Sequence, residues 1–335
     1  MPKIEIERAA ELLERIRGIR VLVVGDLMLD VYLRGGATRI SPEAPVPVVR
    51  VDRQWRGLGG AANVAANLAV LGADTELVGV IGGDGAGVEF EQACDELGIG
   101  RVGARPVPGR PTTVKTRVLV GYQQVARYDR ESDDDLAPAD AEALRRHVES
   151  AAEAASAIVV EDYDKGVMVP AVIEAALDCG RRNGIPVVVD PKAKRFSQYA
   201  GCTVFKPNRS ELASALRANV NTADAEWMER TRRRLECDHL LVTLGQDGMA
   251  LMPGDAGQLL LVPAVARAVY DVSGAGDTVT AVVTAVLAAG GTGQEGAVLA
   301  THAAGIEVGK AGVATVTADE ILDSLRDHAG AHIDS

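Results

Sequence analysis

The residues with the clearest chemical potential form a glycine turn, Val272-Ser273-Gly274-Ala275-Gly276-Asp277-Thr278. An apolar, strand-like run at Val265–Tyr270 precedes the turn, and an apolar, helix-like run at Val279–Ala289 follows it. The first N–H groups of a helix have no acceptor within the helix, and glycines let a phosphate approach those groups closely. The turn therefore predicts an anion-binding site.

Asp277 gives this site a second chemical property. A carboxylate weakens simple phosphate binding, so we expect it to accept a proton from a hydroxyl that attacks a phosphoryl group. The neighbouring N–H groups and a metal would hold the negative charge of the transferring phosphate. An ordinary strand-to-helix turn, in which the helix dipole favours an acid in the first turn, explains the stretch equally well.

Two other phosphate-binding motifs do not fit the spacing. A Walker A loop needs Lys followed by Ser or Thr after its last glycine, and neither is present. A dinucleotide fingerprint needs a third small residue where Val279 stands, although Glu295 does lie about twenty residues further on. A dinucleotide dehydrogenase is therefore a remote alternative.

Composition restricts the class of protein. The chain has 335 residues, is 47% apolar and carries a net charge of −12, which argues against a nucleic-acid or anionic membrane surface. Its four cysteines are far apart and indicate free thiols in a reducing compartment. The longest apolar run is too short to span a bilayer, and the N-terminus does not resemble a signal peptide. We expect a cytoplasmic protein without nucleic-acid or membrane partners.

Short β-prone runs alternate with helical patterns, which predicts an α/β fold with a doubly wound, mostly parallel sheet flanked by helices. No linker divides the pattern, so residues 1–335 are expected to form a single domain. The predicted strands are Arg20–Val24, Glu76–Ile81, Ala157–Val160, Pro186–Val189, Thr203–Phe205 and Leu240–Thr243. The predicted helices are Gly60–Leu71, Gly87–Leu97, Pro138–Ala154, Pro170–Arg182, Ser210–Arg217, Ala223–Leu235 and Gly293–Val308.

Two segments depart from this alternation. Pro45–Arg53 and Thr112–Arg130 are extended and β-prone, and no crossover helix follows them directly. Their alternating pattern suits a small sheet with one wet face. We expect a β-sheet lid, built from about residues 34–56 and 110–130, that closes the site and pairs with a second subunit as a homodimer. A solvent-exposed hairpin is the alternative.

Polar residues follow six of the predicted strands, where a doubly wound sheet binds its ligands. For any single residue, capping or turn chemistry is the simpler explanation, but recurrence at six strand ends favours a site. Lys165 and Lys192 follow neighbouring strands, and the lid offers Lys115, Arg117 and Arg127. These cations predict that the substrate already carries a phosphate. Local ion pairs with Asp162, Asp164 and Asp190 are the alternative.

Several stretches together resemble the ribokinase-like carbohydrate kinases. Gly59-Gly60-Ala61-Ala62-Asn63 is similar to their first signature and Asp271–Thr278 to their second. Within that family the chain resembles the D-glycero-β-D-manno-heptose 7-phosphate kinases from about Arg20 to Thr317. The stretches that carry this resemblance are Gly25–Asp30, Arg39–Val48, Lys115-Thr116-Arg117, Gln123-Gln124, Tyr163 with Lys165-Gly166, Asp190-Pro191-Lys192 and Pro207–Glu211.

The resemblance implies roles for individual residues. Asp277 would be the general base, and the N–H groups of Gly274, Ala275 and Gly276 would form the anion hole. ATP and Mg²⁺ would be the cofactors, with Asn208 and Glu211 holding Mg²⁺ partly through water. The nucleotide would lie near Arg209, Ser210, Thr243, Gly245 and His302, and a monovalent cation, K⁺, near Asp271 and Ser273. Sugar binding would fall to Asp30, Gly59, Gly60, Asn63, Arg127, Asp162, Lys165 and Lys192.

The chain departs from the family pattern at four positions. Glu161 and Asp164 stand where Ser and Ala are usual, and Lys206 stands where Thr is usual. His302 stands where Asn is usual, in a region expected near the adenine. These departures bear on the sugar and the nucleotide more than on the reaction.

The predicted function is ATP-dependent phosphorylation of heptose 7-phosphate at C1, in ADP-heptose and lipopolysaccharide precursor synthesis. A kinase for another sugar phosphate, such as fructose 1-phosphate or a tagatose phosphate, is the first alternative. A non-catalytic regulator that binds nucleotide or sugar is the second. Relatives often carry a C-terminal nucleotidyltransferase domain, and since the sequence ends at Ser335 we expect only the kinase step.

Overall fold

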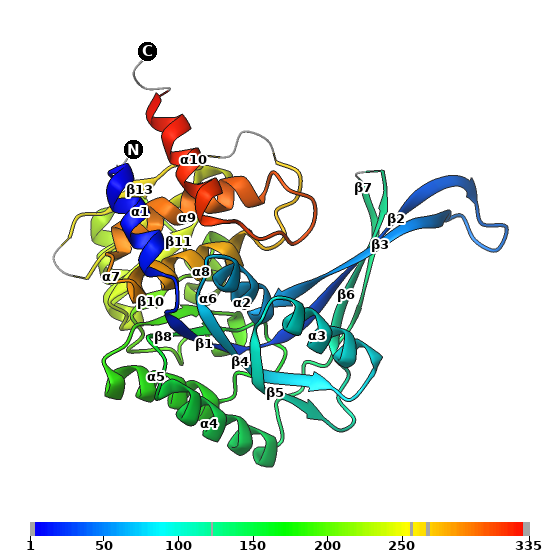
Figure 1. Cartoon of the computed structure of the whole chain (residues 1–335), viewed down its shortest axis with the longest axis horizontal. Helices are drawn as coiled ribbons and strands as arrows, with labels where there is room; N and C mark the ends of the chain where they lie inside the picture. Colours follow the sequence, from blue (N-terminus) through cyan, green and yellow to red (C-terminus); the bar gives the residue numbers. More distant parts are fainter. Residues whose placement is uncertain (1–3, 122, 255–256, 266–268, 331–335) are drawn as a thin grey trace.

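The computed structural model describes residues 4–121, 123–254, 257–265 and 269–330, and its centre is a large sheet (Figure 1). Within these residues the sheet has nine strands in the order β13-β12-β11-β10-β9-β8-β1-β4-β5. All neighbours pair in parallel except β11 with β12 and β12 with β13. This confirms the predicted doubly wound, mostly parallel sheet.

The central strands are short runs of buried branched residues, as a sheet covered on both faces requires. Every residue of β8 and β9 is buried, including the acids Glu161 and Asp190 at their carboxyl ends. The strands are β1 (Arg20–Gly25), β4 (Asp74–Gly82), β5 (Gly100–Val107), β8 (Ala157–Glu161), β9 (Val187–Asp190), β10 (Val204–Phe205), β11 (His239–Thr243), β12 (Met249–Met252) and β13 (Leu260–Val262).

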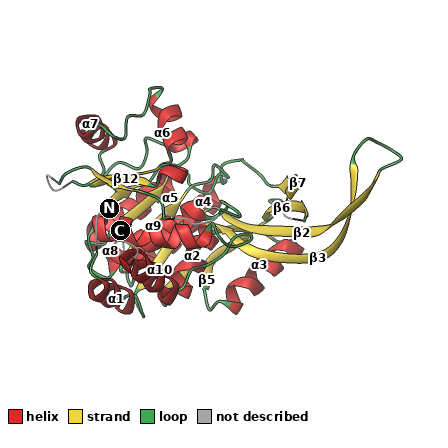
Figure 2. Cartoon of the chain, turned by 90° about the horizontal axis from the view of Figure 1, so that it is seen from above, coloured by secondary structure: helices red, strands yellow, loops and turns green. Residues whose placement is uncertain are grey.

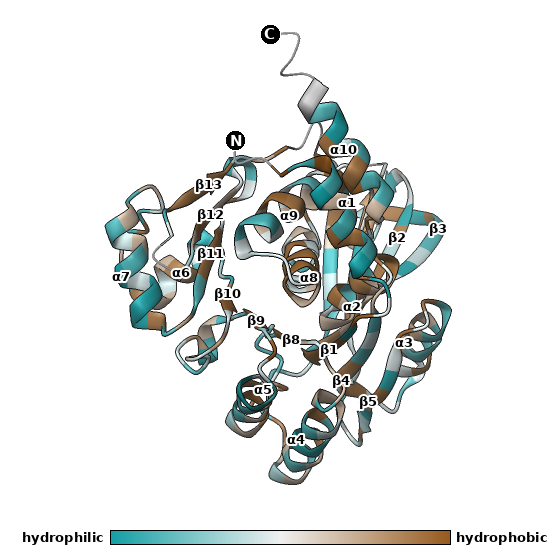
Figure 3. Cartoon of the chain, turned by 60° about the vertical axis from the view of Figure 1, so that its left-hand side comes forward, coloured by the Kyte–Doolittle hydropathy of each residue, from teal (hydrophilic) through white to brown (hydrophobic). Residues whose placement is uncertain are grey.

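Helices cover both faces of the sheet and enclose a hydrophobic core on each side (Figure 3). One core packs α1, α2, α3, α8, α9 and α10 on the sheet, and the other packs α4, α5, α6 and α7. The helices are α1 (Ile6–Arg15), α2 (Ala61–Val70), α3 (Gly85–Glu96), α4 (Pro138–Ala152), α5 (Pro170–Asn183), α6 (Arg209–Leu216), α7 (Ala225–Leu235), α8 (Ala275–Ala288), α9 (Gly293–Glu307) and α10 (Ala318–Gly330).

A second, smaller sheet projects from the body (Figure 2). Its order is β3-β2-β6-β7, and it consists of β2 (Leu27–Ile40), β3 (Pro47–Gly60), β6 (Thr113–Val120) and β7 (Gln123–Arg130). The predicted small sheet is therefore present, but the predicted lid segment of about residues 34–56 left out the inner half of β2. Asp30, expected in a loop after the first strand, lies inside β2. The inner half of β2 is as apolar as a strand of the main sheet, so its sequence does not show that it belongs to the lid.

The segment before the glycine turn differs from the prediction. Val265, Val269 and Tyr270 are not in a strand, and residues 266–268 lie outside the described residues. The apolar chain is held by one acceptor instead, because the N–H groups of Tyr270 and Asp271 both donate to the carbonyl of Val308. The strands β5, β12 and β13 and the helices α1 and α10 were also not predicted from the sequence.

Two further observations concern membrane-spanning helices and cysteines. No helix among the described residues is both long and apolar enough to cross a membrane. All four cysteines are free and buried, as the spacing predicted.

His302 lies in the interior between α9 and α10. Its Nδ1 is 2.8 Å from the hydroxyl oxygen of Ser324, and its ring meets the edge of His328 at 5.7 Å. Burial, followed by the nearby His328, lowers the pKa of His302 from 6.5 to about 4. The ring is therefore neutral in the folded protein at neutral pH.

This histidine should make the fold sensitive to acid. Between pH 6.5 and about 4 the unfolded chain binds a proton at His302 that the folded chain does not, so stability falls as pH falls. His302→Gln should remove on the order of 1 kcal/mol of that loss at pH 5. Urea unfolding at pH 5 and pH 8 measures it, with His147→Gln on α4 as the matched control. An equal loss in wild type and His302→Gln would contradict the assignment.

Candidate active site

Asp277 lies in the first turn of α8, close to the carboxyl ends of β8 and β9. It is 4% exposed, and both carboxylate oxygens are held. Oδ2 accepts a hydrogen bond from Nδ2 of Asn63 at 2.7 Å, and Oδ1 accepts one from the hydroxyl of Tyr163 at 2.6 Å. Burial raises the pKa of Asp277 to about 6, although both hydrogen bonds oppose the shift. The result is a fixed, buried carboxylate with raised basicity.

The turn before Asp277 has the geometry of an anion hole. Gly274 adopts φ 98° and directly precedes α8, so the N–H groups of the first turn point out of the helix end. Gly274, Ala275 and Gly276 are each only partly buried, which leaves room for an anion to approach. The predicted anion-hole residues and the predicted base are thus contiguous at one helix start.

Tyr163 connects Asp277 to two lysines from different parts of the chain. The ammonium groups of Lys115, on lid strand β6, and Lys192, after β9, each lie 5.0 Å from the centre of its ring. Cations near an aromatic face interact favourably with it. Tyr163 therefore joins the lid, the sheet edge and Asp277. Tyr163 belongs to one of the stretches that carry the family resemblance, but no role was predicted for it.

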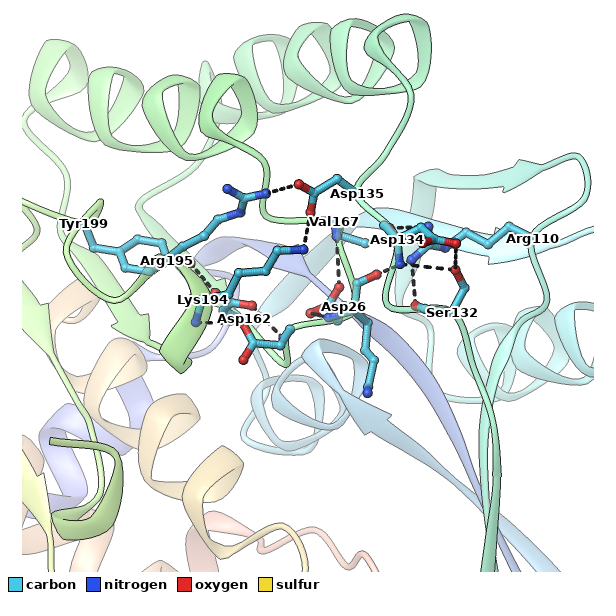
Figure 4. Close-up of polar contacts among 12 residues, drawn as sticks. Asp26, Arg110, Ser132, Asp134, Asp135, Asp162, Val167, Lys194, Arg195 and Tyr199 are labelled. Carbon is cyan, nitrogen blue, oxygen red and sulfur yellow. Dashed lines mark hydrogen bonds and ion pairs between the residues drawn. The ribbon is translucent and has the colours of Figure 1, made fainter. Parts of the chain in front are cut away.

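Asp26 holds the loop that carries Tyr163 (Figure 4). It follows β1, is 1% exposed, and its carboxylate accepts the backbone N–H groups of Tyr163 at 2.7 Å, Lys165 at 3.1 Å and Val167 at 3.2 Å. Burial raises the pKa of Asp26 to about 6, with Asp162 adding to the shift. The loop position therefore depends on one buried acid.

A buried set of charges lies behind Asp277. Carboxylate oxygens of Glu161, Asp190 and Asp277 all fall within 4.8 Å of one another. The ammonium of Lys206 donates to Oδ2 of Asp190 at 2.7 Å, and both side chains are almost completely buried. Two of the departures from the family pattern, Glu161 and Lys206, thus meet in one place.

The residues predicted for nucleotide and Mg²⁺ lie together at the start of α6. Asn208 and Glu211 form a capping box, in which each side chain accepts the other's backbone N–H at 2.8 Å. Thr243 pairs with Asn208 across an isolated bridge, and Gly245 follows with φ 61°. Ser210 donates to Oδ1 of Asn208 at 2.7 Å, and Arg209 lies 3.4 Å from Asp247.

The residues predicted to bind sugar hydroxyls lie at the root of the lid. The carboxylate of Asp30 pairs with Arg117 of β6, and both side chains are buried. Gly59 faces this pair, and a Cβ there would lie 2.3 Å from Oδ2 of Asp30, so only glycine leaves room for that acid. Gly60 has φ 58° and ends β3 directly before α2, which carries Asn63.

The predicted phosphate-binding cations have partners within the protein. Lys165 pairs with Glu131 at 2.9 Å and Asp133 at 2.7 Å, and Lys192 pairs with Glu211. Arg127 is exposed and pairs with Asp129 at 3.1 Å. The two oxygens of Asp162 accept the hydroxyl of Tyr199 at 2.6 Å and the N–H of Asp164 at 2.8 Å. Ion pairing of these lysines was therefore correctly considered as an alternative. The acids that pair with them are Glu131, Asp133 and Glu211, and not the expected Asp162, Asp164 and Asp190.

The predicted cation residues lie beside a buried acid that the sequence analysis missed. Oδ1 of Asp271 accepts the N–H of Ser273 at 2.9 Å. Oε1 of Glu307, at the end of α9, would lie 3.2 Å from a Cβ on Gly274. Burial, followed by Asp271 and Asp277, raises the pKa of Glu307 to about 9. No sequence motif identifies Glu307, because an acidic residue at the end of an apolar helix has no distinctive spacing.

Comparison with known proteins gives the family. Residues 19–320 match the pattern described as pfkB family carbohydrate kinase. The chain belongs to the pfkB family of carbohydrate kinases. The bifunctional protein HldE of Geotalea uraniireducens is 45% identical over 337 residues, which cover 100% of this chain and 67% of that protein. HldE of Citrifermentans bemidjiense is 46% identical over 313 residues, covering 92% and 64%. The chain thus spans about two thirds of these relatives.

Solved structures share the fold of this pfkB-family chain. The phosphofructokinase-2 from Escherichia coli in complex with potassium has a TM-score of 0.76 and 18% identity, covering 93% of this chain and 99% of that one. The ribokinase of Arabidopsis thaliana complexed with ribose and ATP has a TM-score of 0.71 and 21% identity, covering 92% and 99%. The fold is ribokinase-like, and the protein is a sugar kinase.

The pfkB-family kinase should depend on Asp26 to place Tyr163. Asp26→Asn keeps one acceptor but turns an NH₂ toward backbone N–H groups, so the unfolding free energy should fall by about 2–4 kcal/mol. Urea denaturation at pH 7 measures the change. Asp135→Asn is the matched control, because Asp135 is an exposed acid that pairs with Lys194 and Arg195 in the same region. It should cost less than about 1 kcal/mol. Equal effects of the two variants would contradict the role of Asp26.

Proposed function

We propose that the protein transfers the γ-phosphoryl group of ATP to the anomeric C1 hydroxyl of D-glycero-β-D-manno-heptose 7-phosphate. The product, the 1,7-bisphosphate, would serve ADP-heptose and lipopolysaccharide precursor synthesis. The observation that carries the proposal is the buried carboxylate of Asp277, oriented on both oxygens at the start of α8. The choice of heptose rests on the resemblance to heptose 7-phosphate kinases and on the HldE relatives.

In the proposed mechanism Asp277 takes the proton of the C1 hydroxyl as its oxygen attacks phosphorus. A pKa near 6 leaves the carboxylate ionised by roughly ten to one at pH 7 while keeping it more basic than an exposed aspartate. Asn63 and Tyr163 fix its two oxygens, so it needs little reorganisation when substrate arrives. The N–H groups of Gly274, Ala275 and Gly276 would hold the charge that develops on the phosphoryl oxygens.

The family's Mg²⁺ fits the residues at the start of α6. Glu211 is part-exposed and, with Asn208, offers the oxygen donors that Mg²⁺ prefers, so these two would hold the ion, partly through water. When bound, the ion would neutralise phosphate charge. A monovalent cation fits beside Asp271 and Ser273, because neither oxygen of the buried Glu307 has a side-chain donor among the described residues.

The substrate's own phosphate would bind near Tyr163. Lys115 and Lys192 approach this ring from the lid and from the sheet, and Lys165 lies on the same loop. A phosphate would compete with Glu211 for Lys192 and with Glu131 and Asp133 for Lys165. Charge-assisted bonds of this kind contribute about 1.5–3 kcal/mol each. A kinase for another sugar phosphate would use the same cations, so substrate choice needs a direct test.

The proposal is tested by ATP consumption across hexose, pentose and heptose phosphates. Heptose 7-phosphate should give the highest kcat/KM, and Asp277→Asn should lower its turnover by roughly two to four orders of magnitude. Because the variant keeps the size of the side chain, ATP should still bind, which calorimetry can measure. Near-normal turnover of Asp277→Asn, or a clear preference for a different sugar, would refute the mechanism or the substrate respectively.

We also propose that the protein is a homodimer joined through the lid. Every residue of β7 is exposed, and five large apolar side chains of the lid region are at least 40% exposed, namely Ile40, Val46, Val51, Val125 and Tyr128. A small sheet is marginally stable in water without a further apolar surface to cover it. A second copy of the lid would supply that surface by symmetry.

Light scattering at micromolar concentration should therefore give twice the chain mass. Val51→Glu and Tyr128→Glu place charges in the lid surface and should shift the protein toward monomer. Val102→Glu is the matched control, because Val102 is 81% exposed on β5 in the main sheet. A wild-type monomer would rule out the lid interface. So would a wild-type dimer that Val102→Glu dissociates and that Val51→Glu and Tyr128→Glu leave intact.

A further inference from the structure

Three buried groups beside the proposed base have no part in the mechanism above. Glu161, Asp190 and Lys206 come from the carboxyl ends of the neighbouring strands β8, β9 and β10. Lys206 is 2% exposed and Glu161 is fully buried. A charge this deep costs several kcal/mol unless it is paired, so the arrangement needs an electrostatic explanation.

The charges in this set do not balance if every group is ionised. The one fully buried ammonium, Lys206, is bonded to Asp190, yet Glu161 and Asp277 also lie within 4.8 Å. Neither side-chain oxygen of Glu161 has a donor among the described residues. A protonated Glu161 removes one negative charge and can itself donate to Asp190. Burial, followed by Asp190 and Asp277, raises the pKa of Glu161 accordingly.

Lys206 also lies directly beside the anion hole. A Cβ built on Gly276 would have only two neighbours within 4 Å, the ammonium of Lys206 at 3.6 Å and Oδ2 of Asp190 at 3.9 Å. The ion pair therefore lies next to the residue that precedes Asp277. The titratable and charged groups around Asp277 are Tyr163 and Glu161 from β8 and its loop, Asp190 from β9, Lys206 after β10 and Glu307 from α9. Lys192, after β9, lies over the ring of Tyr163 and also acts on Asp190 and Glu161.

Charges so close to Asp277 must act on it. At an effective dielectric constant near 20, a unit charge about 5 Å away changes a pKa by roughly two units. In the native protein the negative charge of Asp190 and the positive charge of Lys206 act in opposite directions on Asp277. Without Lys206, the negative charge of Asp190 would be offset only by Lys192, which is itself paired with Glu211, so protonated Asp277 would be favoured.

We propose that Lys206 is a positioning residue that neutralises Asp190 and thereby keeps Asp277 ionised, with Glu161 serving as a neutral hydrogen-bond donor to Asp190. This inference rests on the proposed function, in which Asp277 is the base. It assigns a purpose to a lysine and a glutamate for which the resemblance implied no role. Lys206 acts through Asp277 and need not touch either substrate.

The first test is the dependence of kcat/KM for the sugar phosphate on pH at saturating ATP. The acid limb should lie near pH 6 in the wild type, where Asp277 titrates. In Lys206→Met it should move up by at least about one pH unit, with the KM for ATP unchanged. The double variant Asp190→Asn/Lys206→Met removes both charges, so its acid limb should return to within about half a unit of wild type.

Two further variants isolate the parts of the set. Glu161→Gln should leave the acid limb in place, because an amide replaces a neutral carboxyl and can donate to Asp190. Lys194→Met is the matched control, since it removes an exposed ammonium that pairs with Asp135 on the same edge of the sheet. A downward shift in Glu161→Gln would mean that Glu161 is ionised and would overturn its assigned role.

A second measurement needs no substrate. The stability difference between each protein and the same protein carrying Asp277→Asn should change with pH from about 3.8 to 6 and then level off. The sign follows because a raised folded-state pKa loses stability as pH rises through that range. In the Lys206→Met background the levelling point should move above pH 7.

The two measurements separate the inference from the proposed function. If no sugar phosphate is turned over, or Asp277→Asn stays active, the proposed function fails, while the stability curves still report the effect of Lys206 on Asp277. If Asp277→Asn is inactive but Lys206→Met moves neither the acid limb nor the levelling point, the inference is wrong. It is also wrong if the double variant keeps the full shift of Lys206→Met.

Discussion

The active site depends on keeping a carboxylate buried without a direct ion pair. Asp277 is nearly inaccessible, and its nearest donors are the neutral groups of Asn63 and Tyr163. Neutral donors stabilise the anion enough to keep it charged but leave it basic, whereas a bonded arginine or lysine would hold its pKa low. Fixing those donors is the common task of α2 and of the loop after β8.

That task extends well beyond the site. The loop of Tyr163 is tied by three backbone hydrogen bonds to Asp26, and Asp26 follows the central strand β1. Ammonium groups from the lid and from the main sheet each lie 5.0 Å from the centre of the Tyr163 ring. Tyr163 therefore contacts the proposed base, is tied to the end of the central strand through Asp26, and lies near a lysine of the lid. Each of these contacts joins neighbouring residues in space. Together they make the position of the Asp277 carboxylate depend on several segments along the same edge of the sheet.

Much of this architecture was predictable from sequence. Buried branched runs such as Ala157–Val160 and helical periodicity such as Pro170–Arg182 depend on local patterns, and the structure reproduces both within a few residues. The glycine turn at the start of α8 was predictable because glycines followed by a long apolar run are typical of a turn that opens a helix. The inner half of β2 was missed because its apolar residues do not show whether a strand joins the main sheet or the lid.

The side-chain partners were less predictable. Lys165 and Lys192 were expected near strand ends, but their acids, Glu131, Asp133 and Glu211, come from other segments, and pairing across segments leaves no spacing in the sequence. Glu161 and Lys206 were noticed separately, as unusual residues. Only the parallel register of β8, β9 and β10 brings them together around Asp190.

The two long strands β2 and β3 pair regularly next to the body of the protein and irregularly further out. Their first contacts, from Leu27 with Gly60 to Arg34 with Arg53, form an unbroken ladder whose inner residues are buried in the body. The ladder is interrupted between Arg34 and Gly35 and again between Ala37 and Arg39. Bending at these two irregularities would move the outer ends of β2 and β3. Asp30 and Gly59 lie in the regular part of the ladder and would keep their positions. A tip captured by another molecule would thus transmit little force to the sugar-binding residues.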